Sequence, residues 1–225
     1  ITQLADIVIP TVSGAEIGVA ATKSYVGQLA VFMLLAEEVL ALKGSPLAQK
    51  LKSDFDKLPA LAEKTLKCAP FVKELAEKMK NASGVFYIGR GMDYAVALEA
   101  ALKLKEIAYL HCEGYAAGEL KHGTFALIDE NTLVAAIITQ KNIAEKTLNA
   151  VHEVKARGAK VLLVTSLDGI KTNTADFVLN LPAVDENLAP VLSVIPAQLY
   201  AYYVSRLKGL DPDKPRNLAK SVTVE

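Results

Sequence analysis

The sequence has no excess of charge of either sign. Its 225 residues include 25 basic and 25 acidic side chains, and charged residues make up 22% of the total. Nucleic acids and anionic membrane surfaces attract proteins through clustered lysine and arginine. We therefore expect neither nucleic acid nor a membrane as a partner, and any anion must be held by local groups.

Cysteine is scarce, and long uninterrupted apolar runs are missing. Two cysteines, Cys68 and Cys112, both expected on helices, are too few for a disulfide framework. The most apolar stretch, Val26–Leu42, is interrupted by a glutamine and two glutamates, so we predict a buried or interface helix and no membrane span. We recognise no signal peptide, and the expected location is the cytoplasm.

The length is sufficient for one sizeable domain, because 225 residues with 52% hydrophobic side chains can bury a substantial core. From Gly84 onward, short apolar runs alternate with longer amphipathic ones, which is typical of parallel strands joined by crossover helices. The predicted strands are Val85–Ile88, Leu133–Ile138, Val161–Val164 and Phe177–Leu181, separated by helices near 93–111, 142–157 and 188–207. The predicted fold is a three-layer α/β/α sandwich with a parallel sheet.

The first 82 residues follow a different pattern. Asp6–Pro10 is predicted to be the last strand of a sheet whose other strands are not in this sequence, so we interpret the chain as a fragment. A helical segment from about residue 16 to 43 ends at Gly44 and Pro46, and helices are expected at 46–66 and 69–81. Residues 211–225 show no helical period and are interpreted as an ordered or mobile tail.

Gly89-Arg90-Gly91 lies between a predicted strand and a predicted helix. At this position backbone N–H groups can face an anion. A dinucleotide-binding fingerprint requires a third glycine where Tyr94 stands, which argues against NAD. A simple tight turn is the alternative, and no cofactor is predicted.

Glu99, Lys103 and Glu106 recur at spacings of four and three in an otherwise apolar helical segment, so they share one helix face. A carboxylate partly removed from water holds a proton more readily, which makes Glu106 a candidate proton carrier. A salt-bridged stripe on the surface would show the same spacing. Composition alone slightly favours this surface interpretation.

Two histidines and one lysine complete the candidates. His111 and His122 stand eleven residues apart, which fits no helical ligand pair, and no metal site is predicted. His122 is a candidate acid or base near neutral pH, although a lone loop histidine is more often structural. Lys220 is either a solvated lysine or an amine that an ordered tail brings over a site.

Five segments together resemble the glucosamine-6-phosphate synthase family. They are Ala15–Lys23, Gly89–Gly91, Ala97–Ala108, Ala116–Gly123 and Pro215–Glu225. The family's isomerase portion is built from two sugar isomerase (SIS) lobes with a flavodoxin-like fold. The resemblance implies that residues 1–82 are the end of the first lobe with linking helices, residues 83–209 the second lobe, and residues 210–225 an active-site tail. The glutaminase domain and the phosphate-holding first lobe are then the missing parts of a parent chain.

The resemblance also implies an enzyme that converts fructose 6-phosphate and glutamine-derived ammonia into glucosamine 6-phosphate, the first step of amino-sugar nucleotide synthesis. Glu106 would move a proton between C1 and C2. His122, donated by the neighbouring subunit of a homodimer, would assist ring opening, and Lys220 would close over the sugar and form a Schiff base. The fragment alone is expected to bind substrate weakly or not at all.

Supporting roles follow from the same resemblance. Lys103 would orient substrate hydroxyls or tune Glu106, because an ammonium within about 4–6 Å favours the ionised carboxylate. Val19 and Ala219 would supply backbone contacts to the substrate, and Glu99 would support Lys103. The alternative is a non-catalytic SIS module that senses sugar phosphates, but such a sensor has no evident need for the proton carrier, the histidine and the tail lysine together.

Overall fold

The computed structural model describes residues 2–170 and 173–220. The part of the expected tail beyond Lys220 lies outside the described residues.

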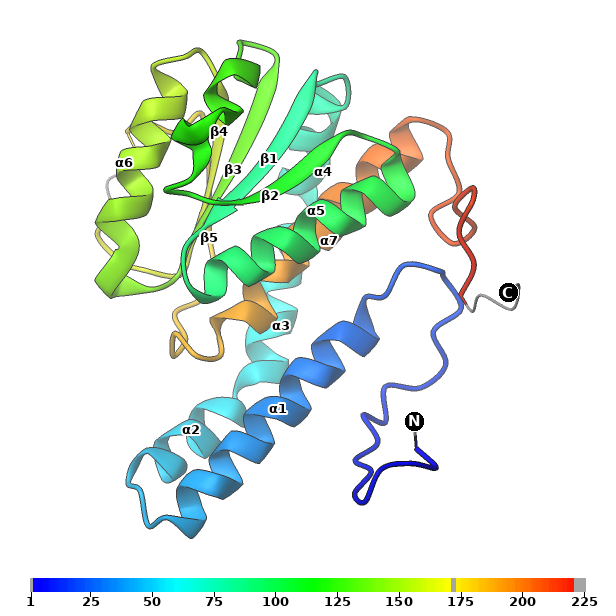
Figure 1. Ribbon diagram of the computed structural model, residues 1–225, viewed down its shortest axis with the longest axis vertical. Coiled ribbons are helices and arrows are strands. Elements are labelled where there is room, and N and C mark those ends of the chain that lie inside the picture. Colours follow the sequence, from blue (N-terminus) through cyan, green and yellow to red (C-terminus); the bar gives the residue numbers. More distant parts are fainter. Residues whose placement is uncertain (1, 171–172, 221–225) are drawn as a thin grey trace.

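A sheet of five parallel strands forms the centre of the molecule (Figure 1). The strands are β1 (Gly84–Gly89), β2 (Cys112–Ala116), β3 (Thr132–Ile138), β4 (Lys160–Thr165) and β5 (Phe177–Asn180). Their spatial order is β2-β1-β3-β4-β5, which is the order of flavodoxin-like folds. The sheet grows in opposite directions from β1, because β2 is added on one side of it and β3 on the other.

Helices cover both faces of the sheet, as predicted. The side chains of β3 alternate between two separate cores: Leu133, Ala135 and Ile137 face one core, and the residues between them face the other. The first core includes α4 (Ala69–Met79), α5 (Met92–Ala108) and α7 (Ala189–Leu207), and the second includes α6 (Ala144–Lys155). The three-layer α/β/α sandwich predicted from the sequence is confirmed.

The N-terminal helices project from this sandwich (Figure 1). They are α1 (Lys23–Leu42), α2 (Leu47–Phe55) and α3 (Leu58–Leu66). No residue of α1 is buried, and Phe32 and Leu42 are 68% and 86% exposed. By length and composition α1 is apolar enough to cross a membrane, so the glutamine and the two glutamates of Val26–Leu42 do not by themselves exclude a span. One such helix is weak evidence for a membrane. The structure shows that the apolar side chains of α1 are exposed to solvent in the described part of the chain.

Several element boundaries differ from the predictions. Asp6–Pro10 forms no strand, because an extended segment needs a neighbouring strand to satisfy its backbone. The first helix begins at Lys23 rather than near residue 16, and the segment 46–66 is divided into two helices at Asp56–Lys57.

Strand β2 was not predicted. The helix expected over 93–111 ends at Ala108, because Tyr109 adopts the left-handed conformation with φ 55°. Cys112 therefore lies on a strand and not on a helix, and Cys68 precedes α4. Gly114 allows β2 to approach α5 closely, since a Cβ there would lie 2.8 Å from the backbone of Leu98.

Candidate functional site

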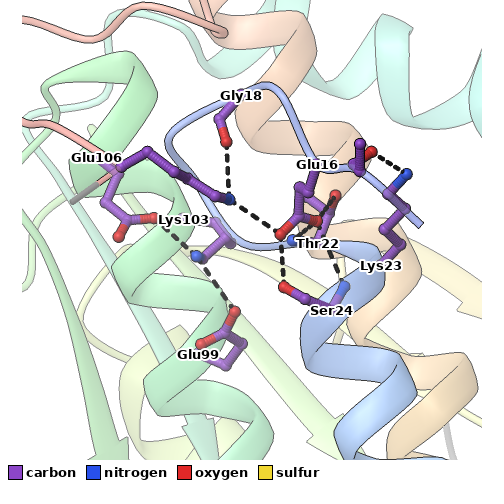
Figure 2. A network of polar contacts seen from close by, with 10 residues as sticks. Glu16, Gly18, Thr22, Lys23, Ser24, Glu99, Lys103 and Glu106 are labelled. Atoms are coloured by element: carbon purple, nitrogen blue, oxygen red, sulfur yellow. Dashed lines mark hydrogen bonds and ion pairs between the residues drawn. The ribbon is translucent and has the colours of Figure 1, made fainter. Parts of the chain in front are cut away.

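A lysine is buried on α5 between two carboxylates (Figure 2). The Nζ atom of Lys103 lies 2.7 Å from Oε2 of Glu106 and 3.3 Å from Oε1 of Glu99. The Lys103 side chain is only 3% exposed, whereas Glu106 and Glu99 retain 20% and 12%. The interpretation as a surface stripe is therefore wrong for Lys103, and the carboxylates form the edge of the group that reaches solvent.

The position of α5 explains this burial. The helix packs on the sheet through one side and on α7 through another, and Ala97, Ala100 and Ala101 are fully buried in those contacts. Small side chains let the neighbouring elements approach, so the longer Lys103 side chain on this helix is enclosed. A buried ammonium is tolerated only when opposite charges compensate it, which Glu99 and Glu106 do.

Burial acts on the outer members of the group as well. Burial raises the pKa of the Glu99 carboxyl, although the charge of Lys103 opposes the shift and that of Glu106 adds to it. Tyr25 of α1 is half-buried, and burial together with the charge of Glu99 raises the pKa of its phenol. Tyr25 therefore connects the N-terminal arm to the charged group on α5.

A third carboxylate, Glu16, lies at the N-terminus of α1 in the leading loop, residues 13–22. Its Oε1 accepts hydrogen bonds from the backbone N–H groups of Thr22 at 2.9 Å and Ser24 at 3.3 Å, and its Oε2 accepts one from the Ser24 hydroxyl. A carboxylate at a helix N-terminus also interacts favourably with the helix dipole. Burial alone would raise the pKa of Glu16, but these hydrogen bonds and one from Lys220 hold it well below its usual range.

The C-terminal tail reaches this carboxylate. Nζ of Lys220 donates to Oε2 of Glu16 at 3.0 Å and to the carbonyl of Gly18 at 2.9 Å. Farther back along the tail, the backbone N–H of Arg216 donates to the Tyr109 hydroxyl at 2.7 Å, and the Arg216 guanidinium lies 4.4 Å from the ring centroid. The tail is thus fastened both just beyond α5 and on the leading loop.

Replacing Glu16 by glutamine is expected to release the tail. Lys220 loses its charged acceptor, so trypsin should cleave after Arg216 several-fold faster than in the original protein. The same release is expected on acidification. A depressed folded pKa means that the Glu16 contribution is complete above the unfolded value of 4.5 and is lost as the pH falls below it. Glu38→Gln, on the exposed side of α1, is the control, and equal cleavage rates in the two variants would contradict the role of Glu16.

A cavity of about 330 Å³ joins the leading loop, α5, α7 and the tail. Glu16, Ile107, Gln198 and Asp213 are among its lining residues. Ile107 directly follows Glu106 on α5, although the side chains of the charged α5 group are not among the lining residues. The amide nitrogen of Gln198 is buried without a hydrogen-bond partner in the described chain.

The structure brings most, but not all, of the predicted site residues together. Val19 and Ala219 flank the junction of loop and tail, and the Val19 N–H is already bound to the carbonyl of Asp213 at 3.2 Å. His122 lies elsewhere, on a short 3-10 helix, η1 (Leu120–His122), after β2. Its side chain is 63% exposed, and within the described chain its ionic neighbour is Glu119 at 3.8 Å, with no contact to Glu106.

Sequence reasoning missed Glu16, Tyr25 and Gln198. Glu16 belongs to the segment Ala15–Lys23 that carried the family resemblance, and a carboxylate shortly before a Thr and a Ser at a helix start is a usable signal for capping. Tyr25 and Gln198 sit on ordinary helix positions. Their roles arise only when α1 and α7 pack beside α5.

The Gly89-Arg90-Gly91 turn holds no open anion site at the helix N-terminus. The first N–H of α5, that of Met92, donates to Oε1 of Gln140 at 2.8 Å. The buried Asp93 carboxylate binds the backbone N–H and the hydroxyl of Thr139. The Gln140 amide oxygen thus occupies the N–H group that an anion at this helix end would use. Within residues 2–170 and 173–220, no three His, Cys, Asp or Glu side chains gather as metal ligands would.

Comparison with known families and sequences gives a single answer. The family model described as SIS domain matches residues 78–207. Glutamine–fructose-6-phosphate aminotransferase (isomerizing) from Thermococcus kodakarensis is 46% identical over 227 residues, and that from Clostridium acetobutylicum is 48% identical over 231. Each alignment covers 100% of this chain, but the chain spans only 38% of the length of these relatives.

Solved structures agree with these matches. The C-terminal domain of glucosamine-fructose-6-phosphate aminotransferase from Francisella tularensis superposes with a TM-score of 0.83 and 36% identity, covering 89% of this chain and 58% of that one. Glucosamine-6-phosphate deaminase from Thermotoga maritima gives a TM-score of 0.69 at 24% identity, covering 92% of this chain and 59% of that one. The second likeness supports the fold alone.

Proposed function

The chain belongs to the SIS domain family, and on that premise we propose that it is the C-terminal part of the isomerase portion of a glutamine–fructose-6-phosphate aminotransferase. The observation that carries the proposal is the buried Lys103 between Glu99 and Glu106, with Glu106 next in sequence to the cavity-lining Ile107, together with the contact of Lys220 with the cavity-lining Glu16. An acid–base carboxylate and two amines are the groups that a ketose–aldose conversion needs.

The proposed chemistry begins with Lys220. Its amine attacks C2 of open-chain fructose 6-phosphate and expels water, which gives a Schiff base, and ammonia then displaces the lysine to give the fructosimine. Glu106 removes a proton from C1 while the imine nitrogen takes up a proton, so the C2 imine becomes an enolamine. A proton then returns to C2 as the C1 hydroxyl loses its own proton. C1 becomes an aldehyde and C2 carries the amine, so the conversion is redox-neutral and requires no cofactor.

The remaining residues hold these groups in place. Lys103 positions the Glu106 carboxylate through the 2.7 Å ion pair, and Glu99 balances the rest of its charge. Backbone groups of Val19 and Ala219, beside the junction of loop and tail, contact the sugar. Lys220 must leave Glu16 to act as a nucleophile, because an ion-paired ammonium has no free lone pair. The arrangement with Glu16 is therefore the resting position of the tail lysine.

We infer a homodimer in which His122 serves the site of the neighbouring subunit. His122 is exposed and makes no contact with Glu106 in its own chain, which supports this inference. The exposed apolar surface of α1 supports the inference that another part of the parent protein covers it. We propose that this part is the first SIS lobe and that the glutaminase domain lies farther away. Residues 1–82, 83–209 and 210–225 are then the linking segment, the second lobe and the active-site tail. Both cysteines are free, which suits a cytoplasmic location.

The proposal is tested by replacing Lys220 with methionine in the full-length protein. With fructose 6-phosphate and glutamine, the original protein is expected to form glucosamine 6-phosphate, and the variant is expected to do so at least about 100-fold more slowly, because covalent catalysis is lost. Borohydride should trap a sugar adduct on Lys220 and on no other lysine. Lys214→Met, also in the tail, is the matched control.

The alternative, a sugar-phosphate sensor without catalysis, predicts a different outcome. A sensor binds fructose 6-phosphate but leaves the C1 proton in place, forms no borohydride adduct and yields no amino sugar. That result with the original full-length protein would replace the proposal.

A further inference from the structure

A second cavity, of about 160 Å³, lies away from the Glu106 group. Arg90 follows β1, Gly118 and Lys121 follow β2, and Lys146 and Asn149 belong to α6. The loops therefore come from the carboxyl ends of two neighbouring strands, which is where ligands of open α/β sheets bind. The functional proposal makes no use of this cavity.

Arg90 lies at the cavity wall, and packing against a glycine fixes its position there. Its Nε–H is buried without a hydrogen-bond partner, and buried donors are rarely left unpaired in native proteins. The guanidinium lies directly against Gly118, where a Cβ would be 2.6 Å from Nη2. Any larger residue at position 118 would push the guanidinium away, so the glycine fixes the place of Arg90.

The charges around the cavity are mostly positive. Arg90, Lys121 and Lys146 supply three cations, and Glu153 is the one carboxylate among the lining residues. In the described ranges no carboxylate lies within 4 Å of any of the three cations. Three cationic side chains and an amide that converge without partners form a receptor for negative charge.

We propose that this cavity binds a small oxyanion, a phosphate group in the first instance. A planar guanidinium with parallel N–H donors matches phosphate oxygens, and lysines add point charges. A water molecule takes about 30 Å³ in the liquid, so the cavity has room for a phosphate and some of its hydration. Lys121 directly precedes His122 on η1, and the bound anion fixes the segment that carries this histidine; that consequence alone rests on the proposed function.

The test uses equilibrium dialysis of radiolabelled inorganic phosphate with the full-length protein, with and without saturating fructose 6-phosphate. One phosphate per chain is expected to remain bound in the presence of the sugar. Arg90→Met and Lys146→Met should each weaken that binding about tenfold or more, since a charge-assisted hydrogen bond contributes that much. Gly118→Val should do the same through Arg90, whereas Glu153→Gln should strengthen binding. Lys73→Met, on the exposed side of α4, is the control.

Three results would overturn the inference: no retained phosphate, complete displacement by fructose 6-phosphate, or unchanged binding in the Arg90 and Lys146 variants. Folding of each variant is checked by its circular dichroism spectrum. Because Lys146 lies on the surface of α6, phosphate binding by its variant remains informative even if the Arg90 change disturbs the loop. A protein that retains phosphate but forms no glucosamine 6-phosphate would contradict the proposed function and leave the anion site standing.

Discussion

Replacing Glu106 by glutamine in the full-length protein is expected to slow the exchange of the C1 proton of fructose 6-phosphate with solvent by about 10²–10⁴-fold, the range typical of a lost general acid–base group. Glutamine has nearly the same shape but cannot take up a proton. Because the change leaves Lys103 paired with Glu99 at 3.3 Å, the fold should survive. Exchange is followed by proton NMR in deuterated water.

Two further measurements make this result specific to proton transfer. The variant should bind fructose 6-phosphate with nearly the original affinity, so the loss appears in kcat and not in KM. Glu77→Gln, an exposed carboxylate on α4, should exchange the C1 proton at the original rate. Exchange retained in Glu106→Gln would remove Glu106 from the mechanism and shift attention to Glu16, a carboxylate that lines the cavity.

Replacing Lys103 by methionine is expected to lower the free energy of unfolding by about 3 kcal/mol, the lower end of the range for breaking a buried ion pair. Methionine fills the same space, so the loss comes from the two carboxylates that no longer face a cation. They retain 20% and 12% exposure, which keeps the effect from being larger. Urea unfolding of the chain measures it.

A double variant separates charge from packing. Adding Glu99→Gln to Lys103→Met removes one uncompensated charge and should recover part of the lost stability, which is a non-additive result. Lys105→Met, on the exposed side of the same helix, should change stability by no more than about 0.5 kcal/mol. An equal loss for Lys105→Met would mean that burial of Lys103 is not the cause.

The sandwich was predictable because the signals for it are local. Strands β1, β3 and β4 are continuous apolar runs buried on both faces, and such runs predict parallel strands directly. Strand β2 carries Glu113 and Gly114 at the edge of the sheet, and its pairing with β1 depends on the close approach to α5. That close approach is a tertiary contact, and the periodicity of residues along the sequence does not reveal it.

The site was predictable to the extent that spacing determines it. Positions 99, 103 and 106 had to share a face of any helix, and the structure joins them. The sequence did not decide whether that face was exposed to solvent or buried, because its burial depends on the packing of α7 against α5. The partnership of Glu16 with Lys220 joins residues with no local relation, and only the folded chain brings them together.

The bond between Lys220 and Glu16 closes a loop of 204 residues. Its equilibrium cost is modest, since each doubling of loop length adds only about 0.6 kcal/mol, but contacts between distant residues form late in folding. During synthesis Glu16 of the leading loop cannot form this bond until Lys220 has been added to the chain. The contact of the tail lysine with Glu16 is therefore expected only in a molecule whose central sheet has already formed, so an incompletely folded chain would not hold in place the amine that we propose starts the chemistry.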